Sequence, residues 1–251
     1  MKVELIDYQE NALDLLIYTK STRLAAGQGL SDIASWSTER KLEHLEYMRH
    51  TIKSSWEFVR YIFRISEVSR VFTHQLVRTR TQSYAQESQR TVDVHENGFY
   101  FPPFKHGGFD PYYNAVLESV DTYVQLTELG EDNQDARYVL PEGTLTSIIV
   151  GTDLRTLHQT AETRLCKRTA GEYQEVFKAI KAEVIKVHPW AEKFIQVACV
   201  NTGICIFPNY KECPVQPHTI KVTDTFLDFV KQIWEENDHV ANPVAKDGKT
   251  M

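Results

Sequence analysis

Cysteine is scarce in this chain: there are four, at Cys166, Cys199, Cys205 and Cys213, with no CxxC pair. We interpret them as reduced thiols, and the spacing of the last three matches no zinc pattern, so we expect no metal site. No apolar run approaches the roughly 20 residues that cross a bilayer. The N-terminal MKVELIDYQE carries acids and lacks the apolar centre of a signal peptide. We therefore expect a cytoplasmic protein with no membrane partner.

Positive charge is also in short supply. The 28 Lys and Arg residues are outnumbered by 34 Asp and Glu, which gives a net charge of −6. No overall basic field would attract duplex nucleic acid, so a nucleic-acid-binding module is disfavoured. A nucleotide monomer needs only a local cluster of arginines, which remains possible. Glycine-rich nucleotide loops are absent too, and this argues against a doubly wound dinucleotide fold.

The 251 residues and 42% hydrophobic content are enough to bury a core. We predict an α/β (α+β) fold, a single domain with a small central sheet flanked by helices over residues 1–215. A C-terminal extension, 216–251, is expected to end in disorder. Apolar spacing predicts strands over 56–65 and 144–150. It predicts helices over 8–20, 38–50, 111–130 and 223–236, and a further helix capped by Ser66. Residues 153–188 are predicted to be helical with an interruption near 169–171, and residues 80–107 are predicted to be mostly loop.

The most unusual stretch is 75–90, QLVRTRTQSYAQESQR. Its sixteen residues hold three Arg, four Gln and two Ser. Arginine supplies planar, forked donors for phosphate, serine adds a hydroxyl, and glutamine can read the edge of a base. Composition alone leaves two interpretations open, an anion-recognition surface and a solvated polar loop.

The spacing within this stretch resembles the signature of flavin-dependent thymidylate synthases, written RHR, seven residues, then Ser. Here it stands as Arg78-Thr79-Arg80, seven residues, Ser88. Further matches keep the family's order over roughly residues 50–175. They are SSWEF (54–58), SRVFTHQLVR (69–78), SYAQESQR (83–90), ARYVLP (136–141), DLR (153–155) and TRLCKR (163–168). Several ordered matches are more specific than one short motif.

The resemblance implies a flavin-dependent thymidylate synthase fold and C5 methylation of a pyrimidine nucleotide monophosphate, dUMP to dTMP. It implies FAD as cofactor, methylenetetrahydrofolate as carbon donor and NADPH as reductant, in a homotetramer with sites between subunits. Arg164 matches the residue that contacts the pyrimidine ring. The other nucleotide positions are Gln75, Arg78, Gln86, Glu87, Ser88, Gln89, Arg90 and Arg137. The flavin positions are Ser54, Glu57, Arg78, Thr79, Arg80, Asp153, Arg155 and Gln159.

The chain departs from the family pattern at several of these positions. Thr79 replaces the middle His of RHR, and Asp153 replaces an Asn. The helix that normally continues A-Q-W-E-I-R reads TAGEYQ over 169–174, which should open space near Arg164. Three interpretations remain: an ordinary synthase, a relative that methylates or hydroxymethylates UMP or dCMP, and a non-enzymatic nucleotide-binding remnant.

Two smaller features are left open. The aromatic run FYFPPF (99–104) is either a hydrophobic plug at a subunit interface or a flap with an aromatic surface for folate. His158 and His188 share no metal spacing with other histidines, and we expect each on a helix surface or behind the site.

Overall fold

The computed structural model describes residues 1–23, 29–92, 97–169, 171–205, 207 and 213. Its centre is a four-stranded antiparallel sheet in the order β1-β2-β4-β3, in agreement with the predicted fold class. The strands are β1 (Lys2–Tyr8), β2 (Arg60–Ser69), β3 (Ser83–Gln86) and β4 (Leu145–Asp153).

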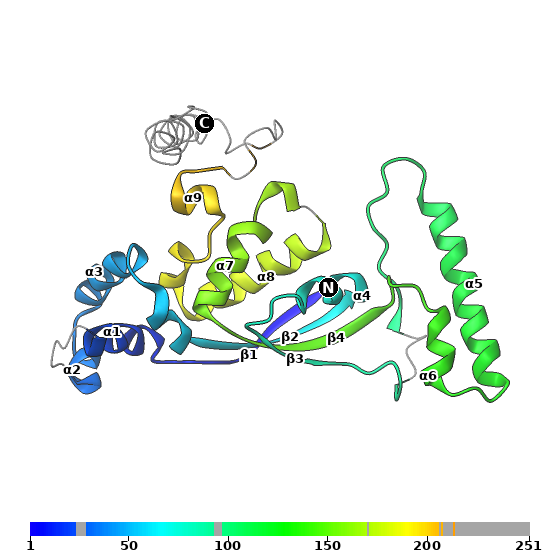
Figure 1. The fold of residues 1–251 in the computed structure, drawn as a ribbon, viewed down its shortest axis with the longest axis horizontal. Coiled ribbons are helices and arrows are strands. Elements are labelled where there is room, and N and C mark those ends of the chain that lie inside the picture. The colour runs from blue at the N-terminus through cyan, green and yellow to red at the C-terminus, as the bar shows by residue number, and fades with distance from the viewer. Residues whose placement is uncertain (24–28, 93–96, 170, 206, 208–212, 214–251) are drawn as a thin grey trace, which may run out of the picture.

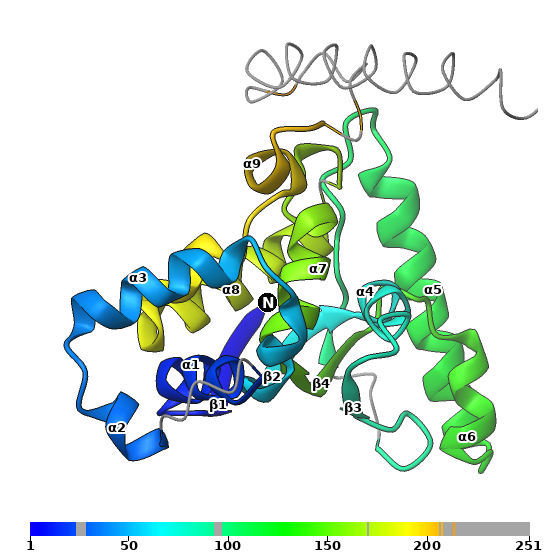
Figure 2. The same cartoon turned by 60° about the vertical axis from the view of Figure 1, so that its left-hand side comes forward.

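Helices surround this sheet unevenly. In Figures 1 and 2, α7 and α8 lie over one face of the sheet, α1 to α3 gather at one end, and α5 and α6 form an arm at the other. The α-helices are α1 (Ala12–Arg23), α2 (Leu30–Ala34), α3 (Thr38–Arg49), α4 (Arg70–Leu76), α5 (Phe109–Glu128), α6 (Asn133–Ala136), α7 (Leu154–Arg164), α8 (Glu172–Val187) and α9 (Ala198–Thr202). The 3-10 helices are η1 (Lys53–Phe58), η3 (Arg137–Val139), η4 (Lys167–Thr169) and η5 (Pro189–Lys193).

The core lies between the sheet and α7 and α8. Alternate residues of β2, namely Tyr61, Phe63 and Ile65, are fully buried, as the period-two pattern of a half-covered strand requires. They share one hydrophobic cluster with Phe177 and Val184 of α8. This packing fixes the positions of β4 and of α7, which follows β4 directly.

Two local predictions were wrong, and the strand predicted over 56–65 lies four residues later, at Arg60–Ser69. The helix expected from residue 8 begins at Ala12, because Lys2–Tyr8 forms β1 although its sequence shows no clean alternation. The helix after β2 is capped by Ser69 instead of Ser66: Ser69 Oγ accepts a hydrogen bond from Phe72 N (3.0 Å). Ser66 lies in a bulged part of β2, where Glu67 has a φ of 57°.

The loop expected over 80–107 also contains a strand, β3, which pairs with β4 through four residues. Its sequence SYAQ is polar because it forms the edge of the sheet. The helix predicted over 223–236 and the extension over 216–251 lie outside the described residues. Within the described ranges, no helix is long and apolar enough to span a membrane.

Candidate active site

The turn that carries Arg78, Thr79 and Arg80 is built directly onto the end of α4. Thr79 N donates to Leu76 O (3.0 Å), and the Tyr84 hydroxyl of β3 lies 2.7 Å from Thr79 O. The turn is therefore held between a helix and a strand. The guanidinium groups of Arg78 and Arg80 are exposed, and neither pairs with another side chain of the described ranges. Two unpaired cations on a fixed backbone can bind a phosphate or diphosphate.

The rest of the motif continues along the sheet edge. Gln86 Nε2 donates to Thr73 Oγ1 of α4 (2.9 Å), and Glu87 Oε1 accepts from Asn97 Nδ2 (2.7 Å). Ser88 Oγ accepts a hydrogen bond from Arg90 N (3.2 Å), and both side chains are exposed. Gln89 between them is partly buried. Gln86 and Glu87 thus hold the segment in place, while Ser88 and Arg90 present free polar groups.

Arg137 lies in η3, where its Nε donates to Gln134 O (3.1 Å). Beside it is Arg70, which we did not predict as a site residue. Burial and the nearby Arg137 lower the pKa of Arg70, and Glu87 opposes that shift. Its guanidinium also reaches Glu87 O (3.5 Å). Arg70 is part of the SRVFTHQLVR match, so the sequence held a signal for it. Arg70 and Arg137 form a second concentration of positive charge.

Arg164 ends α7 and is partly buried. Its guanidinium carbon lies 4.0 Å from the centre of the Tyr173 ring, within cation–π distance. The next residue along α8, Gln174, donates through Nε2 to Cys166 O (2.7 Å), just beyond Arg164. The end of α7 is therefore held against the first turn of α8.

The predicted flavin positions Ser54, Glu57, Asp153, Arg155 and Gln159 form what we call the flavin-side cluster, on η1 and α7. Arg155 Nη1 forms a salt bridge with Glu57 Oε1, which joins the two elements. Asp153 caps α7, with Oδ1 accepting from Thr156 N (2.8 Å). The hydroxyl oxygens of Thr156 and Thr81 lie 3.1 Å apart, so the cluster adjoins the Arg78–Arg80 turn. Ser54 and Gln159 are exposed.

Two cavities flank these residues. A pocket of about 630 Å³ is lined by Asp153, Thr81, Ser83 and Arg60. A largely apolar pocket of about 430 Å³ is lined by Gln75, Tyr100, Pro102, Gly171 and Tyr173. It contains the open space expected from the TAGEYQ segment, since a Cβ placed on Gly171 meets nothing within 4 Å. Neither pocket includes Ser88, Arg90 or Arg137 in its lining.

Comparison with known proteins decides the family. A family model described as "Thymidylate synthase complementing protein" matches residues 4–190. A flavin-dependent thymidylate synthase from Saccharolobus solfataricus is 32% identical over 204 residues, covering 80% of this chain and 78% of that protein. The chain belongs to the flavin-dependent thymidylate synthase family. A second member, from Pyrococcus furiosus, is 28% identical over 227 residues, covering 82% of this chain and 89% of its own.

Solved structures agree on the fold of this flavin-dependent thymidylate synthase family member. The Helicobacter pylori enzyme complexed with FAD and dUMP matches with a TM-score of 0.63 at 18% identity, covering 78% of this chain and all of that one. A UMP/dUMP methylase from Streptomyces cacaoi bound with 5-Br dUMP gives 0.65 at 19%, covering 78% and 97%.

One departure from the family pattern has a structural explanation. Asp153 introduces a carboxylate where the family has an amide, next to a predicted cofactor position. In the structure this carboxylate accepts hydrogen bonds from Thr156 N and Thr156 Oγ1 at the start of α7. Asp153 therefore serves as the N-cap of α7.

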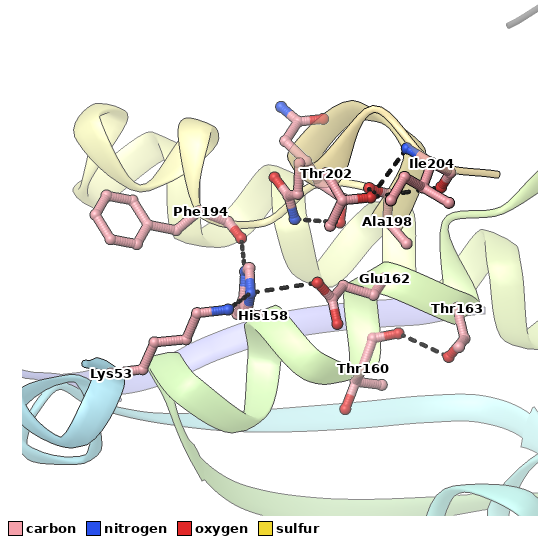
Figure 3. A network of polar contacts seen from close by, with 11 residues as sticks. Lys53, His158, Thr160, Glu162, Thr163, Phe194, Ala198, Thr202 and Ile204 are labelled. Carbon is pink, nitrogen blue, oxygen red and sulfur yellow. Dashed lines mark hydrogen bonds and ion pairs between the residues drawn. The ribbon is translucent and has the colours of Figure 1, made fainter. Parts of the chain in front are cut away.

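Behind the flavin-side cluster is a buried polar network (Figure 3). His158 of α7 is only 4% exposed, which places it in the interior and not on a helix surface. Its Nδ1 lies 2.6 Å from Phe194 O, which can only accept, so Nδ1 carries the proton. Nε2 then accepts from Lys53 Nζ at 2.6 Å. The network fastens α7 to η1, the two elements that carry the flavin-side cluster.

Burial lowers the pKa of His158, and the nearby Lys53 acts in the same direction, while Phe194 O and Glu162 oppose it. Burial likewise lowers the pKa of His188, which is 5% exposed. Burial raises the pKa of the Cys199 thiol, with smaller contributions from Cys205, Cys213 and Cys166. Among the described residues, no group of three or more His, Cys, Asp or Glu could hold a metal ion.

Proposed function

We propose that this protein transfers a one-carbon unit to C5 of dUMP and reduces it to the methyl of dTMP, with FAD as cofactor. Methylenetetrahydrofolate supplies the carbon and NADPH the reducing equivalents. The observation that carries the proposal is the retention of the family's nucleotide residues on a fixed scaffold. Residues 75–90 and Arg164 occupy the ends of α4, β3 and α7, in a chain that matches the family over residues 4–190.

Nucleotide recognition falls to residues with free polar groups. Ser88 and Arg90 are exposed and would bind the phosphate through charge-assisted hydrogen bonds. Arg137, with the adjoining Arg70, adds positive charge for the same group. Gln75 lines the apolar pocket, where its amide can read a base edge. Gln86 and Glu87 hold the segment in shape through their bonds to Thr73 and Asn97.

The described residues fit a flavin dinucleotide. Arg78 and Arg80 offer unpaired guanidinium groups that suit a diphosphate, and Thr81 links their turn to α7. Ser54, Thr79, Asp153, Arg155 and Gln159 would supply further polar contacts, with Glu57 holding Arg155 in place. When bound, the reduced flavin supplies the electrons for the reaction.

Arg164 is the catalytic residue of this proposal. A guanidinium beside N3 of the pyrimidine and its neighbouring oxygen stabilises the ring anion, which makes C5 electron-rich. No enzyme thiol is needed at C6 in such a scheme. Cys166 lies two residues beyond Arg164, but its backbone carbonyl, bonded to Gln174, is the part that contributes to the site.

The site is completed between subunits of a homotetramer. Gln75 lines the apolar pocket and Asp153 lines the larger pocket, while the phosphate residues Ser88 and Arg90 line neither. A second copy that brings its own Ser88 and Arg90 to these pockets would join the two halves. The exposed aromatic residues Phe101, Phe104 and Phe109 are compatible with a subunit contact.

A visible spectrum of the purified protein, followed by incubation with dUMP, NADPH and methylenetetrahydrofolate, tests the proposal. We expect flavin absorbance and a nucleotide heavier by about 14 Da, the mass of CH₂, produced only with the folate present. A flavin-free protein that leaves dUMP unchanged would contradict it.

UMP is a second candidate substrate. The space at Gly171, open around its Cα, lies in the pocket that Gln75 lines. This space would accommodate the added 2′-hydroxyl of a ribonucleotide. Parallel reactions with UMP and dCMP distinguish the candidates, since only the true substrate gains mass at a comparable rate.

A further inference from the structure

Three consecutive residues at the start of α8 hold the surroundings of Arg164 together. Glu172 accepts from Ser69 N (2.7 Å) and from Ser69 Oγ, which fixes the start of α4. Tyr173 lies under the Arg164 guanidinium, and Gln174 bonds the carbonyl of Cys166. We call Glu172, Tyr173 and Gln174 the α8 clamp. It links α4, which leads into the Arg78–Arg80 turn, to the end of α7.

Tyr173 is the member of the clamp that meets Arg164 directly. The residue is 5% exposed, and its ring packs edge to face on Phe72 of α4, with centroids 5.0 Å apart at 87°. The ring cannot move without disturbing Phe72, so the face it offers to Arg164 is fixed. A cation on a desolvated aromatic face is held more strongly than one in water.

Burial raises the pKa of the Tyr173 hydroxyl, and the adjacent Arg164 opposes that rise. The hydroxyl is fully buried with no hydrogen-bond partner among the described residues. Position 173 falls where the A-Q-W-E-I-R pattern has isoleucine, so an aromatic ring has replaced an aliphatic residue beside Arg164.

We propose that Tyr173 is the positioning residue that holds Arg164 for the pyrimidine. The inference rests on the proposed function, because that function assigns Arg164 to the nucleotide. It goes further by naming a residue at which this chain departs from the family pattern. The side chain acts through Arg164 and touches no reacting atom.

The first test compares Tyr173→Phe with Tyr173→Ile in the full-length protein. Affinity for dUMP is measured by calorimetry and turnover by the nucleotide assay. The phenylalanine variant keeps the aromatic face, so we expect it to stay close to the wild type. The isoleucine variant should lose about fivefold to thirtyfold in affinity, the scale of a partly desolvated cation–π contact. Equal losses in both variants, or none in either, would overturn the proposal.

A double-mutant cycle separates positioning from general destabilisation. Tyr173→Ile placed on Arg164→Ala should weaken dUMP binding no further, because the residue it positions is already gone. Phe177→Leu is the matched control: it alters a buried ring one turn along α8 and should leave dUMP affinity unchanged. Additive losses in the cycle would show that Tyr173 does not act through Arg164.

A readout independent of substrate separates failure of this inference from failure of the proposed function. Phenylglyoxal modification of Arg164 is followed by mass spectrometry without any nucleotide. We expect faster modification in Tyr173→Ile than in the wild type or Tyr173→Phe. If the wild type fails to bind dUMP, the proposed function is wrong, and the modification rates still decide whether Tyr173 holds Arg164. Equal rates in all three proteins would overturn the positioning role.

Discussion

The flavin-side cluster and the segment 75–90 carry similar polar residues but are constructed differently. In the cluster, Arg155 is paired with Glu57 and Asp153 caps α7, with the buried His158 behind them. In the segment, Arg78, Arg80 and Arg90 are exposed and have no partner among the described side chains. The side chains of the flavin-side cluster are therefore held in place by contacts within the chain. The segment 75–90 instead presents unpaired arginine side chains on a fixed backbone.

The difference shows where binding energy can come from. The charge of a paired arginine such as Arg155 is already partly neutralised by its carboxylate partner. Such an arginine can orient a bound ligand but adds little electrostatic binding energy. An unpaired arginine offers its full charge-assisted hydrogen bonds to an incoming phosphate. We therefore expect substitutions in the segment to lower ligand affinity, and substitutions in the cluster to lower stability.

The largest effect is expected at Arg164, the proposed catalytic residue at the end of α7. Arg164→Ala should reduce turnover by about 10²–10³-fold or more, the cost of removing one preorganised charge from a reacting group. FAD should remain bound, which the visible spectrum checks. Arg168→Ala, four residues further on, is the control. Unchanged turnover in Arg164→Ala would remove its catalytic role.

Next in size is the phosphate contact of the segment. Ser88→Ala should weaken dUMP affinity by about 1–2 kcal/mol, the scale of a charge-assisted hydrogen bond, with little change in stability. Calorimetric titration with dUMP measures the first quantity and urea unfolding the second. Ser31→Ala, at an exposed position of α2 that lines neither pocket, is the control. A variant with wild-type affinity would place Ser88 outside the phosphate site.

The cluster should respond in the opposite way. Asp153→Ala removes the cap of α7 and should lower the free energy of unfolding by about 1 kcal/mol. Asp153→Asn keeps an oxygen acceptor for Thr156 N, so it should recover most of this loss. Urea unfolding of the two variants gives the comparison. Equal stability of Asp153→Ala and the wild type would show that the capping bonds contribute nothing.

The smallest effect is a pH dependence of stability from the network of Figure 3. Burial holds the pKa of His158 below its ordinary value of 6.5, so the folded state favours the neutral ring. As pH falls below about 6.5, the unfolded chain binds more protons and the free energy of unfolding decreases. His158→Gln should make this decrease shallower between pH 7.5 and 5.5, whereas the exposed His106→Gln should not. Parallel curves for His158→Gln and the wild type would contradict this.

The sequence predicted the fold class and the long elements, because β2, β4, α3, α5 and α8 have clear periodicity. It missed β1 and β3, whose pairing depends on neighbouring strands more than on their own pattern. The motif predicts Arg78 to Arg90 as site residues from local spacing alone, and this assignment stays a prediction. The contact between Arg164 and Tyr173 could not be predicted, since it depends on how α8 packs against the end of α7.

The central claim is that the exposed arginines of segment 75–90 in one chain complete the site that contains Arg164 and the flavin-side cluster of another chain. Mixing Arg164→Ala subunits with Arg90→Ala subunits, after co-refolding to exchange chains, tests it directly. Each variant alone should be nearly inactive in the dUMP assay. If Arg90 and Arg164 of one site come from different chains, an equal mixture should regain about one quarter of the wild-type activity, because a quarter of the sites are then intact. A mixture no more active than the two variants measured separately would contradict the shared site.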